Sequence, residues 1–138
     1  MNVKKLKEEA KLPTRNFPTD AGLDLCSPEY YMIHPGERMK IPLGLAFDIP
    51  QNHSLLMFPR SGLSLKIGTI ILANVIDASY TGEVHCVAIN GGSEPWIISK
   101  GDKIVQVILV PVNVEECQWV DDIIEKERGN KGFGSSGK

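Results

Sequence analysis

The 138-residue sequence has no large excess of charge of either sign, because 15 Lys and Arg side chains stand against 17 Asp and Glu side chains and the net charge is -2. A protein that holds a nucleic-acid backbone uses a surplus of cations, which displaces the counterions of the phosphates. This chain has no such surplus, and we expect it not to bind nucleic acid.

Long apolar runs are also missing. The longest run, residues 104–112, is interrupted by Gln106 and Pro111, and it falls far short of the roughly 20 residues that span a bilayer. The first residues, MNVKKLKEEAK, contain neither an apolar segment nor the small-residue cleavage site of a secretory signal. We therefore expect no membrane association and a cytoplasmic location.

The sequence shows none of the usual spacings of metal-binding side chains. Cys26, Cys86 and Cys117 lie far apart and form no C-x-x-C motif, and the three histidines show no H-x-H or H-x-x-x-H spacing. A zinc site is not predicted. We expect all three thiols to be buried.

Glycine and proline are frequent, with 13 and 9 residues, and they recur at the intervals of about eight to twelve residues that separate short strands. The segments between them are short and rich in Val, Ile and Leu. They predict strands at 44–49, 54–58, 69–72, 84–89 and 104–110, and thus an all-β fold with a single domain.

Two segments depart from the strand pattern. Residues 61–66 predict one helical turn with Ser61 as its N-cap. Residues 3–11 fit either a short amphipathic helix or a charged edge strand, and the local sequence does not decide between the two.

The C-terminal segment 128–138 is rich in Gly and Ser and has Phe133 as its single apolar side chain. It cannot bury enough surface to order itself. It fits either a frayed terminus or an arm whose N–H and hydroxyl groups wrap a phosphate while the ring stacks on a base. We predict a domain at 1–125 and a flexible arm at 126–138. A P-loop is excluded, because Ser135 stands where that motif has Lys.

Five short motifs follow one another along the chain: 21–25 (AGLDL), 60–63 (RSGL), 75–82 (VIDASYTG), 101–106 (GDKIVQ) and the tail from 128 to 137. Their order and spacing resemble those of the trimeric dUTP pyrophosphatases, the dUTPases, and the resemblance covers almost the whole chain. It implies a distorted β-barrel or jelly-roll-like fold, a homotrimer, and Mg²⁺-dependent hydrolysis of dUTP to dUMP and pyrophosphate. That activity keeps uracil out of DNA and supplies dUMP for dTMP synthesis.

The second motif has a chemical meaning of its own. A triphosphate needs fixed cations and N–H donors, and Arg60 beside Ser61 at a helix start supplies a guanidinium, a hydroxyl and backbone donors together. Taken alone, Arg60 would be interpreted as part of a surface ion pair. The resemblance implies a larger set of substrate-binding residues: Arg60, Ser61, Gly62, Asn74, Ile76, Tyr80, Gln106, Arg128, Phe133, Gly134, Ser135 and Ser136.

The resemblance also assigns roles. Asp77 would be the general base that accepts the proton of the attacking water, although an Asp in a Y-x-G turn can be structural. Tyr80 would pack against the deoxyribose and exclude a 2′-hydroxyl, or serve ordinary hairpin packing. Asp24 would hold Mg²⁺ through water, or cap the turn after Gly22. The backbone of a hairpin that begins at 72–74 and returns at 84–87 would read uracil.

Three positions depart from the family pattern. Asn74 stands where the family usually has Gly, and asparagine tolerates the left-handed backbone region that glycine favours. Ser79 replaces an acidic residue near Asp77, and Lys131 replaces a tail glycine. Two alternatives remain. One is a regulatory nucleotide-binding protein of the kind found in phages, and the other is a dCTP deaminase, which would need a Glu at the position of Val87.

Overall fold

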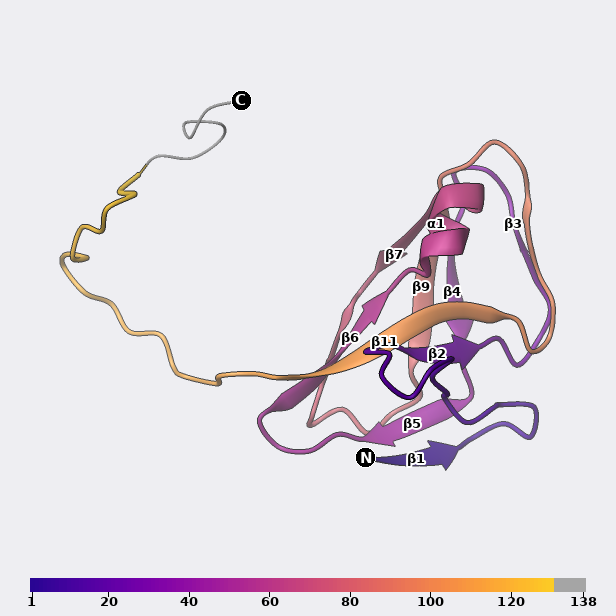
Figure 1. Ribbon diagram of the computed structural model, residues 1–138, viewed down its shortest axis with the longest axis horizontal. Helices are drawn as coiled ribbons and strands as arrows, with labels where there is room; N and C mark the ends of the chain where they lie inside the picture. The colour runs from indigo at the N-terminus through magenta and orange to yellow at the C-terminus, as the bar shows by residue number, and fades with distance from the viewer. Residues whose placement is uncertain (131–138) are drawn as a thin grey trace.

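The chain folds mainly into short antiparallel strands (Figure 1). The computed structural model describes residues 1–130, and this part contains eleven strands and one helix. The elements are β1 (Asn2–Lys5), β2 (Leu23–Cys26), β3 (Tyr31–Ile33), β4 (Arg38–Pro42), β5 (Leu45–Asp48), β6 (His53–Phe58), α1 (Ser61–Ile67), β7 (Thr69–Leu72), β8 (Val75–Asp77), β9 (His85–Asn90), β10 (Trp96–Ile98) and β11 (Lys103–Pro111).

The strands form four small sheets with the orders β1-β5, β10-β3, β2-β11-β6-β8 and β4-β9-β7. The nine-residue strand β11 is central to the largest sheet, because it pairs with β2 on one side and β6 on the other. The all-β prediction with one short helix is confirmed. A closed barrel is not observed. Within residues 1–130 the strands are divided among four separate sheets and do not form one continuous hydrogen-bonded barrel.

The predicted strands agree with the structure to within about two residues at each end. The match at Thr69–Leu72 is complete. The N-terminal segment forms the strand β1 and not a helix, and it pairs with β5 through Val3 and Phe47. Val3 packs against the core while the other three residues of β1 are exposed, which is the pattern of a charged edge strand.

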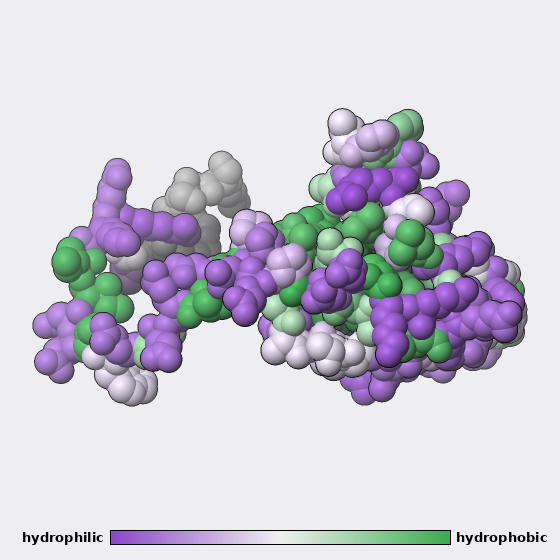
Figure 2. All heavy atoms as spheres, turned by 90° about the horizontal axis from the view of Figure 1, so that it is seen from below, coloured by the Kyte–Doolittle hydropathy of each residue, from purple (hydrophilic) through white to green (hydrophobic). Residues whose placement is uncertain are grey.

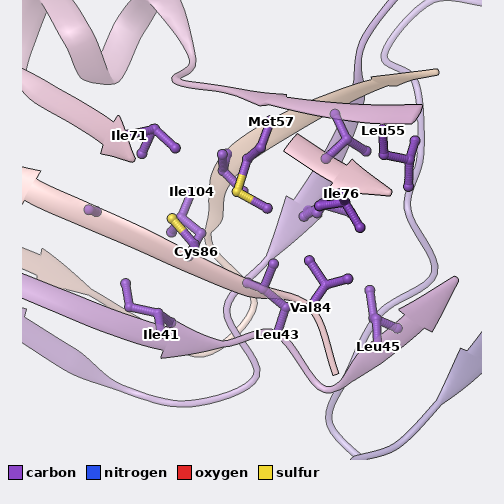
Figure 3. Close-up of a cluster of buried hydrophobic side chains, with 14 of the residues drawn as sticks. Ile41, Leu43, Leu45, Leu55, Met57, Ile71, Ile76, Val84, Cys86 and Ile104 are labelled. Atoms are coloured by element: carbon purple, nitrogen blue, oxygen red, sulfur yellow. The ribbon is translucent and has the colours of Figure 1, made fainter. Parts of the chain in front are cut away.

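The hydrophobic core lies between the four-stranded and three-stranded sheets. Figure 3 shows Met57 of β6 pointing toward Ile104 of β11 and Cys86 of β9, and Leu55 of β6 lying beside Ile76 of β8. Strand β9 alternates in the same way, since Cys86 and Ala88 are buried while His85 and Val87 are only half-buried. This period of two leaves one face of β9 available to line a cavity.

The cysteine prediction is partly wrong. Cys86 is buried, and burial raises the pKa of its thiol to about 12. Cys26 is partly buried, and burial raises its pKa as well. Cys117 is exposed, because it lies in the segment that follows the last strand.

That segment, residues 112–130, leaves the packed body as an extended chain (Figure 1). It exposes large apolar side chains, including Val114, Trp119, Ile123 and Ile124, and Figure 2 shows hydrophobic groups along it outside the body. The last strand ends at Pro111, and the N–H of Val112 still donates to the carbonyl oxygen of Asn52 at 2.8 Å. The predicted boundary at residue 125 stays a prediction. In the described part of the chain, no helix has the length and hydrophobicity needed to cross a bilayer.

Asn90 connects two sheets at the end of β9. Its buried side chain donates from Nδ2 to the carbonyl oxygens of Ile33 (2.9 Å) and Glu94 (2.8 Å), and its Oδ1 accepts from the N–H of Gly92 (3.0 Å). All of its hydrogen bonds are made to the backbone. The amide thus fixes β3 and the 91–95 loop relative to β9.

We expect Asn90→Ala to lower the free energy of unfolding by about 2 to 4 kcal/mol, because it removes three hydrogen bonds and leaves buried backbone groups unpaired. Chemical denaturation measures this change. The matched control is Asn2→Ala, which removes one exposed hydrogen bond to Asp48 and should cost less than about 0.5 kcal/mol. Equal losses for both variants would contradict the role of Asn90.

Candidate active site

A cavity of about 560 Å³ lies where β2, β11 and the start of α1 meet, and we name it the Arg60 cavity. Among its lining residues are Asp24, Arg60, Ser61, Gly62 and Gln106. Strand pairing explains the convergence. Gln106 of β11 is opposite Asp24 on one side and Phe58 on the other, and the chain reaches Arg60 two residues after Phe58. Three of the sequence motifs are thereby brought together.

The carboxylate of Asp24 lies between two cations. Its Oδ1 accepts from Nε of Arg60 at 2.9 Å, and its Oδ2 is 2.9 Å from Nζ of Lys103. Arg60 also donates from Nη1 to the carbonyl oxygen of Lys103 at 3.1 Å. Only 12% of the Asp24 side chain is exposed, so water screens these contacts less than at an open surface. Asp24 therefore fixes the orientation of the guanidinium.

Helix α1 begins differently from the prediction. Its N-cap is Arg60, which makes no side-chain capping hydrogen bond, and Ser61 is the first helical residue. The predicted N-cap at Ser61 is wrong. Because the Ser61 hydroxyl does not cap the helix, it is available to a ligand. Ser61 and Gly62 are both exposed at the cavity, and N–H groups of a first helical turn have no acceptor within the helix.

Gly22 is a site residue whose function the sequence analysis missed. A Cβ at this position would collide with the side-chain oxygen of Gln106. The other end of the same amide donates from Nε2 to the carbonyl oxygen of Pro59 at 3.0 Å. Gln106 is therefore held between Gly22 and Pro59. The Ala-Gly pair of the first motif was the available signal, since a glycine beside a site often permits a close approach.

A second cavity of about 250 Å³ contains the third motif, and we name it the Asp77 cavity. Ile76, Asp77 and Tyr80 line it together with Val87 of β9. Tyr80 is fixed in a turn, because its N–H donates to the carbonyl oxygen of Asp77 (3.0 Å) and its hydroxyl donates to that of Glu83 (2.7 Å). A Cβ at Gly82 would lie 2.8 Å from the Tyr80 hydroxyl oxygen, so this turn requires glycine.

The predicted hairpin is present in altered form. Leu72 is opposite Val87, so β7 and β9 lie side by side as expected. Strand β8 then leaves this sheet and pairs with β6. The left-handed conformation at this crossing belongs to Ala73, with φ of 54°, and not to Asn74. Asn74 donates from Nδ2 to the carbonyl oxygen of Met57 at 2.9 Å.

The two cavities share no lining residue. Asp77 is opposite Ser54 and Gln106 is opposite Phe58 on the two sides of β6, and four strand positions correspond to about 13 Å. One copy of the chain therefore does not bring Asp77 to Arg60 and Gln106. Arg128 lies in the segment that leaves the body. The remaining predicted residues, Phe133, Gly134, Ser135 and Ser136, lie outside the described residues.

Within residues 1–130, no group of three or more His, Cys, Asp or Glu side chains is arranged to hold a metal ion. Asp24 contributes a single carboxylate, and both of its oxygens already contact cations. These residues fit Mg²⁺ only as an ion held mainly by substrate oxygens and water, with Asp24 in the outer shell.

We expect Gly22→Ala to displace the Gln106 side chain and to break its hydrogen bond to Pro59. Binding at the Arg60 cavity should weaken by roughly tenfold, as for the loss of one hydrogen bond in a site. Titration with a non-hydrolysable nucleotide measures the affinity. The folding control is Gly62→Ala, whose new Cβ meets no atom within 4 Å and should leave the free energy of unfolding unchanged or slightly raised. An unchanged affinity in Gly22→Ala would contradict the proposed contact.

Comparison with known proteins agrees with the motif assignment. A family model described as dUTPase matches residues 8–137. A deoxyuridine 5′-triphosphate nucleotidohydrolase of Clostridium tetani is 41% identical over 143 residues, covering 100% of this chain and 97% of that protein. The enzyme of the same name from Nautilia profundicola is 40% identical over 140 residues, covering 100% and 99%.

Solved structures agree as well. The dUTPase of Staphylococcus bacteriophage 80alpha with dUPNHPP has a TM-score of 0.94 and 32% sequence identity, over 99% of this chain and 98% of that chain. A mutant dUTPase from phage phi11 of S. aureus, described as revealing the coordination of a structural Mg(II) ion, has a TM-score of 0.83 and 28% identity, over 88% and 96%. The sequence motifs, the fold and the relatives lead to one conclusion: this chain belongs to the dUTPase family.

Proposed function

We propose that this protein is a dUTP diphosphatase, which hydrolyses dUTP to dUMP and pyrophosphate. The observation that carries the proposal is the presence of two complementary cavities. The Arg60 cavity offers a fixed guanidinium, a hydroxyl and an amide to phosphates. The Asp77 cavity offers a carboxylate and an aromatic ring in a space suited to a nucleoside. The names of the relatives support the same substrate.

The active site is composite and uses more than one copy of the chain. Asp77 can accept the proton of the attacking water only if the substrate phosphorus lies within about one water molecule of it. The phosphate-binding residues of the same copy are on the far side of β6. We therefore propose that the Asp77 cavity of one copy faces the Arg60 cavity of another in a homotrimer with cyclic symmetry.

In this arrangement each residue has a distinct task. Arg60, oriented by Asp24, neutralises phosphate charge, and Ser61, Gly62 and Gln106 donate hydrogen bonds around the α-phosphate. Asp77 accepts the proton of a water that attacks the α-phosphorus in line with the departing pyrophosphate. Bound Mg²⁺ would offset the charge on that leaving group, with Asp24 as an outer-shell partner.

The nucleoside occupies the Asp77 cavity in our proposal. The ring of Tyr80, fixed through Glu83, packs against the deoxyribose and leaves no space for a 2′-hydroxyl. Ile76 and the backbone around Asn74 form the floor for the base. Val87 supports hydrolysis over deamination, because it places an apolar side chain in the Asp77 cavity where a dCTP deaminase needs a Glu.

The C-terminal arm closes the site. In the proposed trimer, Arg128, Ser135 and Ser136 approach the γ-phosphate, and Phe133 beside Gly134 stacks on the base. The exposed apolar side chains at 112–124 support contact with a neighbouring copy, because such groups are normally buried. Asp77 supports hydrolysis over a purely regulatory role. The cytoplasmic location stays a prediction.

With Mg²⁺ present, we expect pyrophosphate release from dUTP in preference to dCTP, dTTP and UTP. The pyrophosphate and the nucleoside monophosphate are measured together for each nucleotide. Equal turnover of UTP and dUTP would contradict the role of Tyr80. Ammonia release from dCTP would overturn the proposed reaction class.

Asp77→Asn keeps the shape of the side chain but removes the proton acceptor. We expect turnover of dUTP to fall by roughly 10² to 10⁴ while nucleotide affinity is largely retained. Single-turnover kinetics and a binding titration separate the two quantities. Asp48→Asn, which changes an exposed carboxylate of β5, is the matched control and should keep the parent rate. Parental turnover in Asp77→Asn would show that another group is the base.

A composite site predicts complementation between two inactive variants. Asp77→Asn and Arg60→Ala damage different cavities, so a mixed trimer contains some sites built from one intact half of each variant. After unfolding and refolding an equal mixture, we expect roughly a quarter of the parental activity, as random assembly of a symmetric oligomer gives. The separately refolded variants are the control. Activity of the mixture that equals their average would mean that each copy has its own complete site.

A further inference from the structure

The Arg60 cavity extends along one face of helix α1. Gly62 and Lys66 both line it, and residues four positions apart lie on the same face of a helix, about 6 Å from each other along its axis. The face between them is open, because a Cβ at Gly62 would meet no atom within 4 Å. The cavity therefore continues from the first turn of α1 to its last turn, which carries Lys66.

Lys66 is a cation of this cavity that no carboxylate engages. The charged side chains of the lining are Asp20, Asp24, Arg60 and Lys66. Arg60 already donates to Asp24 and to the carbonyl oxygen of Lys103. Lys66 is exposed, and within residues 1–130 its Nζ makes no hydrogen bond or ion pair. Its ammonium group is thus available to a ligand in the cavity.

The charge of the cavity depends on Lys66. The two lining carboxylates offset the two lining cations, and Lys103, which contacts Asp24 from outside the lining, adds one further positive charge. Three cations and two carboxylates give this group of residues a net charge of +1. Without Lys66 the net charge would be zero, and the cavity would no longer attract a polyanion.

We propose that Lys66 binds the phosphates beyond the α-phosphate, and that it makes the site prefer a nucleoside triphosphate to a monophosphate. This inference rests on the proposed function, which places the α-phosphate at Ser61, Gly62 and Gln106. A phosphate chain that starts there and follows the open face of α1 reaches the Lys66 ammonium, which donates charged hydrogen bonds to its oxygens. The product dUMP has no phosphate at this end. It loses the contact, and its release after hydrolysis is thereby favoured.

The test measures the affinities of dUPNHPP, inorganic tripolyphosphate and dUMP, with Mg²⁺ present, for the parent, Lys66→Gln and Lys66→Arg. We expect Lys66→Gln to weaken the binding of dUPNHPP and of tripolyphosphate by about tenfold each, as for one charged hydrogen bond at a partly open site. The affinity for dUMP should change by less than about twofold. Lys66→Arg keeps the charge and should retain most of the affinity for all three ligands.

The matched control is Lys5→Gln, which removes the same charge from β1, at the other end of the body from α1 (Figure 1), and should leave the three affinities unchanged. An unchanged affinity of Lys66→Gln for dUPNHPP overturns the inference. Equal losses for dUMP and dUPNHPP also overturn it, since they indicate only a structural role in α1. If Lys66→Gln does not fold, Lys66→Met decides the question. A parent protein that does not hydrolyse dUTP refutes the proposed function, whereas the tripolyphosphate affinities still test Lys66.

Discussion

The Arg60 cavity depends on the carboxylate of Asp24, which contacts Arg60 and Lys103 at the same distance of 2.9 Å. The three residues come from β2, from the segment before α1 and from β11, so the contacts connect three parts of the chain that are distant in sequence. A guanidinium on a long flexible side chain loses conformational entropy when it binds a phosphate. Here much of that loss occurs on folding, and the cavity is organised before a ligand arrives.

This preorganisation also limits what Asp24 can do. A carboxylate that neutralises two cations is not a strong direct ligand for Mg²⁺, which prefers several oxygen donors in an octahedral arrangement. The ion would therefore depend on the phosphates of the substrate for most of its ligands. In the proposed mechanism, the metal would arrive and leave with the nucleotide, and the protein would supply orientation and a balanced charge.

Much of the fold and site could be predicted from sequence, because local patterns report local structure. The Val- and Ile-rich segments gave the strand positions, and the order of motifs gave the family. The predictions that were wrong depend on contacts between residues that are distant in the sequence. Asparagine tolerates a left-handed backbone, but the Asn74 amide bonds to Met57 on β6, and Ala73 adopts the strained conformation instead. The separation of the two cavities likewise depends on the register of β6 with its two neighbours, which no short motif encodes.

The extended segment 112–130 has a thermodynamic consequence. The side chains of Trp119, Ile123 and Ile124 stay exposed in the single copy. They therefore contribute no hydrophobic free energy to the folding of their own chain. If a neighbouring copy buries them, part of the hydrophobic free energy of the native state becomes a free energy of association. The melting temperature of such a protein rises with its concentration, and dilution lowers its stability.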